Sequence, residues 1–114
     1  MLVISLEISK VFESKIVLFD EPDVGLGGAV AEKLGEKIAK LSKSSQVLCI
    51  SHLPQVASFA DTHLLISKKL NKGVTNIAVR SLTKQERVKE IARMMSGKKI
   101  EDEALILADK MIKQ

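Results

Sequence analysis

Aromatic residues and cysteine are scarce in this sequence of 114 residues. It has no tryptophan, no tyrosine and only 3 phenylalanines, so few side chains can stack on unpaired bases, which makes single-stranded nucleic acid a poor candidate ligand. The one cysteine, Cys49, cannot form an intrachain disulfide. It lies in the apolar run QVLCIS, which predicts a small buried hydrophobe in a protein of a reducing compartment.

Long apolar runs and linker-like segments are missing too. No apolar run approaches the roughly 20 residues that span a bilayer, and the sequence does not open on a basic segment followed by a cleavable apolar one. No stretch rich in proline, serine or glycine divides the chain. We therefore expect one soluble, cytoplasmic domain over residues 1–114, with no membrane contact.

Charge of either sign is not concentrated. The 18 basic and 14 acidic residues give a formal net charge of +4 that is spread along the chain, which favours an ordinary solvated surface over a dedicated phosphate-binding patch. The apolar content of 46% argues against disorder and is sufficient for one hydrophobic core.

Strand-like runs recur along the first two thirds of the chain and predict an α/β fold with a mostly parallel sheet. Parallel strands are expected near residues 16–20, 47–51 and 63–67, and the continuous apolar run QVLCIS predicts that the second strand is buried on both faces. The segment VTNIAVR, after a glycine-containing link, predicts a further strand that forms an antiparallel hairpin with the strand before it.

Segments with helical periodicity lie between these strands and after the last of them. Residues 27–43 predict a crossover helix, a short helix is expected to open near Pro54, and two amphipathic helices are expected over residues 83–97 and 101–113. The predicted buried stripe of the crossover helix is Val30, Leu34, Ile38 and Leu41; those of the last two helices are Val88, Ile91, Ala92 and Met95, and Ala104, Ala108, Met111 and Ile112. Residues 1–12 fit strand and helix periods equally.

Two adjacent acids, Asp20 and Glu21, follow the first apolar run. They are therefore expected at the carboxyl edge of the sheet, where open α/β proteins place their ligands. One carboxylate there can orient a hydrated Mg²⁺ while its neighbour polarises an attacking water. Acid pairs also end strands without any chemical role, so the pair alone favours a structural reading.

A second polar site strengthens the functional reading. Ser51 and His52 end the second predicted strand at the same edge, and an imidazole there can contact a transferring phosphate. A lone histidine is more often structural, and we interpret His63 in that way.

Two stretches resemble ABC-type ATPases, and within that superfamily the RecN-type, SMC-like DNA repair ATPases. Residues 16–38, IVLFDEPDVGLGGAVAEKLGEKI, resemble the Walker B strand, catalytic acid and D-loop, and residues 46–61, QVLCISHLPQVASFAD, resemble the switch-histidine segment. The closing ERVKEIARMMSG with the following alanine-containing helix is also similar to the RecN-type terminus, so the resemblance covers nearly the whole chain.

The resemblance implies a role for each matching residue. Asp20 would place Mg²⁺ through water, Glu21 would activate the attacking water, and His52 would sense the γ-phosphate of ATP. The loop that meets a second head would bind the nucleotide through Asp23, Gly25, Gly27 and Gly28. A backbone pressed against both partner and nucleotide favours residues without Cβ and with access to positive φ.

Two ATPase motifs are absent from the sequence: a Walker A loop, Gly-x-x-x-x-Gly-Lys-Ser/Thr, and a Ser-Gly-Gly signature. The resemblance therefore implies the C-terminal lobe of an ATPase head only, and the helix that follows the signature would correspond to residues 1–12. Without the phosphate cradle, the isolated chain is expected neither to bind ATP tightly nor to hydrolyse it.

Two classes of function stay open. The first is part of an enzyme for ATP-dependent repair and recombination of DNA double-strand breaks, which needs the N-terminal lobe of the same head, a second head in a homodimer, and DNA bound by the complete assembly. The second is a non-catalytic module derived from an ABC-type head that binds protein or, weakly, DNA. An acid pair together with His52 favours the first class. Exposed apolar surface left by a missing lobe also predicts self-association.

Overall fold

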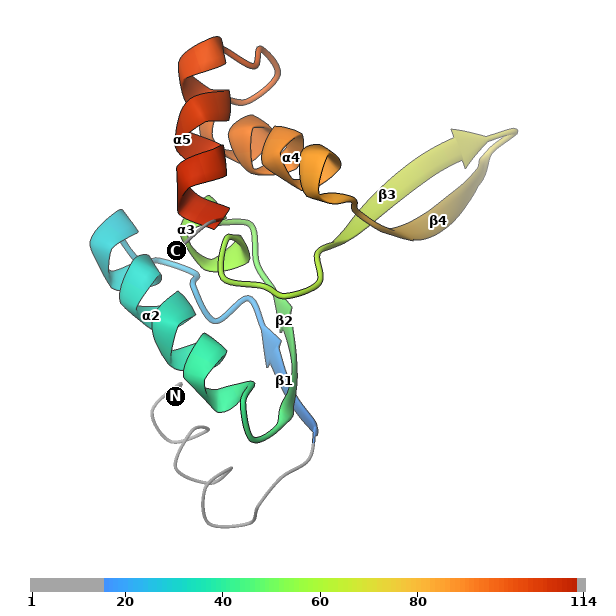
Figure 1. Ribbon diagram of the computed structural model, residues 1–114. Coiled ribbons are helices and arrows are strands. Elements are labelled where there is room, and N and C mark those ends of the chain that lie inside the picture. The colour runs from blue at the N-terminus through green and yellow to red at the C-terminus, as the bar shows by residue number, and fades with distance from the viewer. Residues whose placement is uncertain (1–15, 113–114) are drawn as a thin grey trace.

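The computed structural model describes residues 16–112. The predicted helix at residues 1–12 lies outside this range. The order of elements is β1 (Ile16–Asp20), α2 (Gly28–Leu41), β2 (Gln46–Ile50), α3 (Pro54–Ala57), β3 (Leu64–Asn71), β4 (Val74–Ser81), α4 (Lys84–Ser96) and α5 (Asp102–Ile112). Figure 1 shows α2 beside the β1–β2 pair, α4 and α5 at the other end of the molecule, and the β3–β4 hairpin projecting away from both.

The first unit is a parallel β–α–β arrangement, as predicted. β1 and β2 pair in parallel with Val17 opposite Val47 and Phe19 opposite Cys49, and α2 connects them. The apolar side chains of α2 pack on the face that contains Val17 and Phe19. This packing forms the first core cluster, which also includes Ala31, Leu34, Ile38, Leu41 and Val56.

The second core cluster joins α4 to α5. Ile91, Ala92 and Ala108 are fully buried at its centre, and all other predicted stripe residues of both helices pack around them. Thr83 and Glu86 form a capping box at the start of α4, and Gly97 ends it at a φ of 76°. The two terminal helices and their buried faces are therefore confirmed.

The predicted third parallel strand is wrong. Residues 64–71 pair antiparallel with residues 74–81 in a separate two-stranded sheet, and among the described residues they have no neighbour in the parallel pair. The turn at Lys72 and Gly73, where φ values of 50° and 78° match the two-residue turn that twists with a hairpin, accounts for the antiparallel pairing. The predicted hairpin itself is confirmed, with longer strands than expected.

Three burial predictions are also wrong. β2 is not buried on both faces, because within residues 16–112 only one face of the β1–β2 pair is covered, by α2; Leu48 and Ile50 are 47% and 44% exposed. Cys49 is exposed as well. In α2 the buried residue of the first turn is Ala31, whereas Val30 is 54% exposed, since neighbours on a helix point about 100° apart and only one faces the sheet.

Candidate functional site

The carboxyl ends of β1 and β2 lie side by side and carry the polar residues singled out in the sequence. Asp20 is the last residue of β1, and the backbone N–H of Glu21 donates to the carbonyl of Ile50 at 2.8 Å. Ser51 and His52 follow Ile50 directly. The parallel register thus brings both polar segments to one edge of the sheet, as the sequence predicted.

Glu21 has an unusual backbone. Its φ is 48°, in the left-handed region that residues with a Cβ rarely adopt, and the conformation costs on the order of 1 kcal/mol. The hydrogen bond to Ile50 holds this conformation at the point where β1 ends. Strain of this kind concentrates at functional sites, although the sequence gives no signal for it. The side chains of Asp20, Glu21 and His52 are all exposed at the edge.

Asp23 differs from the other acids because it points inward. It is 1% exposed, and its Oδ2 accepts a hydrogen bond from the hydroxyl of Ser51. The same hydroxyl accepts from the backbone N–H of Leu53 at 3.1 Å, while Asp23 Oδ1 is buried without a partner among the described residues. Asp23 and Ser51 therefore join the loop after β1 to the loop after β2. The sequence pointed to Ser51 only as a strand-end residue.

The thiol of Cys49 lies near this link. Partial desolvation, with the negative charge of Asp23 as the smaller cause, raises the pKa of Cys49 to about 11. The thiol is therefore protonated at neutral pH, although accessible to solvent.

The loop glycines differ in what they require. Gly25 has a φ of 79°, which favours glycine, but Gly27 is the extended N-cap of α2 and Gly28 is its first residue. A Cβ at Gly25 or Gly27 would meet no atom within 4 Å. Of the three glycines in this loop, therefore, only Gly25 has a conformational reason to be glycine.

A magnesium ion is implied by the resemblance, and its residues can be tested against the geometry. Within residues 16–112, no three His, Cys, Asp or Glu side chains gather as a set of metal ligands. Mg²⁺ is commonly held by one or two carboxylates together with phosphate oxygens and water. The exposed carboxylate of Asp20 at the strand end fits such a site, with the remaining ligands supplied by nucleotide and solvent.

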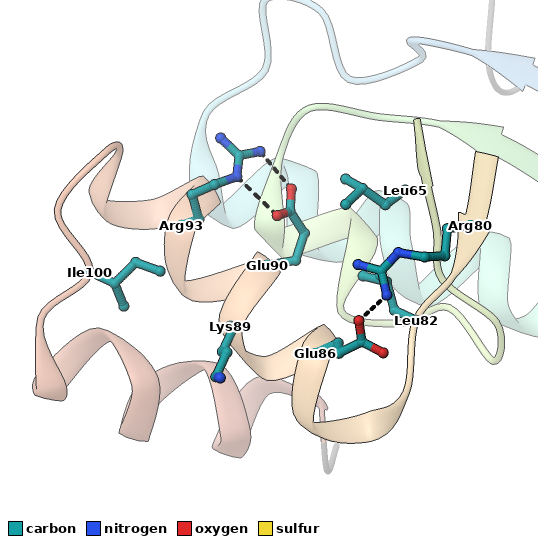
Figure 2. Close-up of a pocket in the computed structure, with 8 residues that line it drawn as sticks. All are labelled: Leu65, Arg80, Leu82, Glu86, Lys89, Glu90, Arg93 and Ile100. Atoms are coloured by element: carbon teal, nitrogen blue, oxygen red, sulfur yellow. Dashed lines mark hydrogen bonds and ion pairs between the residues drawn. The ribbon is translucent and has the colours of Figure 1, made fainter. Parts of the chain in front are cut away.

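A separate pocket of about 310 Å³ lies between the foot of the hairpin and α4. Figure 2 shows two pairs of charged residues pointing toward one another: Arg80 pairs with Glu86, and Glu90 accepts from Nε of Arg93 at 2.9 Å. These cations and anions are mutually neutralised. The Arg80–Glu86 pair connects the hairpin to α4, and Lys89 is the one charged lining residue outside these two pairs.

Comparison with known proteins identifies relatives over almost the whole chain. No protein-family model matches it. The chain is 47% identical over 115 aligned positions to the DNA repair protein RecN of Bacillus subtilis, an alignment that covers 97% of this chain and 20% of that protein. It is also 58% identical over 81 residues to RecN of Halalkalibacterium halodurans, covering 71% of this chain and 14% of that protein. The chain is homologous to a segment of RecN.

RecN of Rickettsia bellii matches similarly, with 46% identity over 96 residues. The chain thus spans about a fifth or less of the length of the RecN proteins that it matches. A solved structure from work on the ATP-driven dimerization and DNA-stimulated activation of SMC ATPases matches with a TM-score of 0.61 and 26% identity, covering 81% of this chain and 54% of that chain. The RecN segment therefore resembles part of an SMC ATPase. No helix within residues 16–112 is long and apolar enough to cross a bilayer.

Proposed function

We propose that this chain is the C-terminal part of a RecN-type ATPase head that acts, with the rest of such a protein, in ATP-dependent repair of DNA double-strand breaks in the cytoplasm. The single observation that carries the proposal is the convergence of Asp20, Glu21 and His52 on one strand edge within a segment homologous to RecN. The strained backbone of Glu21 supports a functional role for that residue.

In this proposal each residue of the edge has one task. Glu21 accepts a hydrogen bond from the attacking water and takes its proton as the bond from that water to the γ-phosphorus forms and the bond to the ADP oxygen breaks. His52 donates to the γ-phosphate. Asp20 would hold Mg²⁺ through water, and the bound ion would neutralise phosphate charge. Gly25, Gly27 and Gly28 form the surface that meets a second head, which contributes the remainder of the site, while the buried Asp23 fixes their loop to Ser51.

A second candidate is a non-catalytic interaction module derived from an ABC-type head. The exposed apolar residues of β3 and β4 favour it. Both candidates predict that the isolated chain binds ATP weakly, so only a complex with the missing part of the protein separates them.

The test pairs this chain with the rest of Bacillus subtilis RecN, truncated before the segment that the chain matches. We expect the mixture to hydrolyse ATP and Glu21→Gln to reduce turnover by at least about 100-fold while ATP binding is retained, because the change removes the base but leaves Asp20. Glu36→Gln, the same change at an exposed position of α2, is the control and should leave turnover unaltered. Equal rates for Glu21→Gln and the unmodified chain would eliminate the assigned base.

A further inference from the structure

The β3–β4 hairpin has one apolar face that nothing in the described chain covers. In its register, directly opposed residues share a face, which places Ile66 with Val79 and Lys68 with Ile77. The apolar face of the hairpin consists of Leu64, Ile66, Leu70, Ile77 and Val79, together with Lys68, Thr75 and Ser81. Its apolar side chains are 49% to 79% exposed.

The opposite face is mainly polar and is partly attached to the body of the molecule. It carries Ser67, Lys69, Asn71, Asn76 and Arg80, together with the apolar Leu65, Val74 and Ala78. At the foot of the hairpin, Leu65 and Arg80 of this face line the pocket against α4 (Figure 2). The apolar face is therefore the free one, and the hairpin extends it away from the helices (Figure 1).

The exposed apolar face leaves the hairpin with little to stabilise its fold. A two-stranded hairpin is marginally stable in water unless a further layer covers it, and contiguous exposed apolar side chains mark interaction surfaces. The charges narrow the choice of partner. The sequence has no acidic residue between Asp61 and Glu86, so Lys68 has no carboxylate on its own hairpin.

A second copy of the hairpin would not satisfy this face. It would bring the same apolar residues and another Lys68, but no carboxylate, and burying an unpaired ammonium is costly. The fitting partner is an apolar protein surface with an acidic side chain opposite Lys68. This chain spans 20% of the Bacillus subtilis relative, so most of a protein of that length lies outside it. That remainder can supply such a surface.

We propose that the apolar face of the hairpin is the docking surface for the remainder of the RecN-type protein, which covers Ile66, Ile77 and their neighbours and pairs a carboxylate with Lys68. This inference rests on the proposed function, because that function supplies the partner. It goes further in naming the surface and the chemistry through which the two parts associate.

A pair of substitutions distinguishes an effect on the apolar face from an effect on the stability of the hairpin. Ile77→Glu places a carboxylate opposite Lys68 on the apolar face, and Asn76→Glu places one opposite Lys69 on the polar face. Both variants change the charge equally and both gain a cross-strand Lys–Glu pair, so the hairpin itself is supported in each. They differ in which face receives the charge.

Binding is measured between the 114-residue chain and the truncated Bacillus subtilis RecN by calorimetry and light scattering. We expect Ile77→Glu to weaken binding at least about 30-fold and Asn76→Glu by less than about 2-fold. Lys68→Glu should weaken binding about 10-fold, whereas Lys69→Glu should not. Equal losses for Ile77→Glu and Asn76→Glu would overturn the proposal. So would a dimer of this chain that Ile77→Glu dissociates, or binding of a DNA duplex that the same variant abolishes.

A chimera keeps the proposal testable if the truncated protein does not fold alone. In it, this chain replaces its matching segment in Bacillus subtilis RecN, and amide exchange is followed in β3 and β4. The proposal expects slower exchange there than in the isolated chain, and unchanged exchange would overturn it. A chimera that hydrolyses ATP without protecting the hairpin would leave the proposed function intact; protection without hydrolysis would reject the function and retain the docking surface.

Discussion

The two pairs of β-strands have similar apolar content, but one is covered by a helix and the other is exposed to solvent. In β1–β2, Val17 and Phe19 are 9% and 4% exposed beneath α2. In β3–β4, Ile66 and Val79 face each other across the strands yet are 56% and 60% exposed. The difference lies in the connections. Parallel strands need a long crossover, and here that crossover is a helix that returns to cover the sheet.

A hairpin carries no such cover with it. Its strands are joined by Lys72 and Gly73 alone, so any layer over its apolar face must come from another part of the protein or from a partner. A parallel β–α–β unit therefore buries one of its faces by its own connectivity, whereas a projecting hairpin depends on what it meets. This contrast predicts unequal sensitivity to mutation.

The largest effect should come from truncating the core of the first unit. Leu34 is 3% exposed in the cluster between α2 and β1, so Leu34→Ala should lower the free energy of unfolding by about 2–5 kcal/mol. Leu70→Ala, at a position 79% exposed on the hairpin, should change it by less than about 0.5 kcal/mol. Denaturant unfolding followed by circular dichroism measures both. A comparable loss at Leu70 would show that the hairpin is already covered in solution.

A smaller effect should come from the contact between α2 and the segment after α3. A Cβ at Gly35 would overlap Cδ2 of Phe59 and lie 3.1 Å from the carbonyl oxygen of Gln55. Gly35→Ala gains helix propensity but must displace the ring, so we expect a net loss of about 1 kcal/mol in unfolding free energy. Thermal and denaturant unfolding of the single variant test this.

The control for that prediction is Gly28→Ala, where a Cβ would lie 3.5 Å from Gln55 Nε2, an ordinary contact distance. It should alter stability by less than about 0.5 kcal/mol. Phe59→Leu should restore part of the loss caused by Gly35→Ala if the clash with the ring is the cause. Without any recovery in the double variant, the carbonyl of Gln55 would become the better explanation.

The sequence predicted the features that depend on local pattern. The helix around Leu34, helix α4 and the hairpin followed from period and turn chemistry. Their buried stripes failed only at Val30, where one helical position separates the covered residue from the exposed one. The strand-edge position of Asp20 was likewise predictable, because parallel strands align their carboxyl ends.

What the sequence could not predict depends on neighbours that periodicity does not specify. An apolar run such as QVLCIS indicates a strand but not the number of layers around it, so Leu48 and Cys49 were expected to be buried. The same ambiguity assigned residues 63–67 to the parallel sheet, although a tight turn directs them into a hairpin. The inward Asp23 and the positive φ of Glu21 arise from loop closure and have no compositional signature.

The smallest effect should appear at the junction of the hairpin and the body, and it depends on pH. The backbone carbonyl of His63 accepts a hydrogen bond from the backbone N–H of Leu82 at 2.9 Å, and the imidazole ring of His63 is half-buried. Burial, and then the charge of Arg87, lower the pKa of His63, with Glu90 opposing them.

The unfolded chain, in which His63 has an ordinary pKa near 6.5, therefore binds the proton more readily than the folded one. The contribution of His63 to stability is complete above about pH 6.5 and is lost as the pH drops from there through the folded pKa. His63→Gln should flatten the dependence of unfolding free energy between about pH 7 and 5.5, and the exposed His52→Gln should preserve it. If the slope persisted in His63→Gln, some other group would control how firmly the uncovered hairpin is attached.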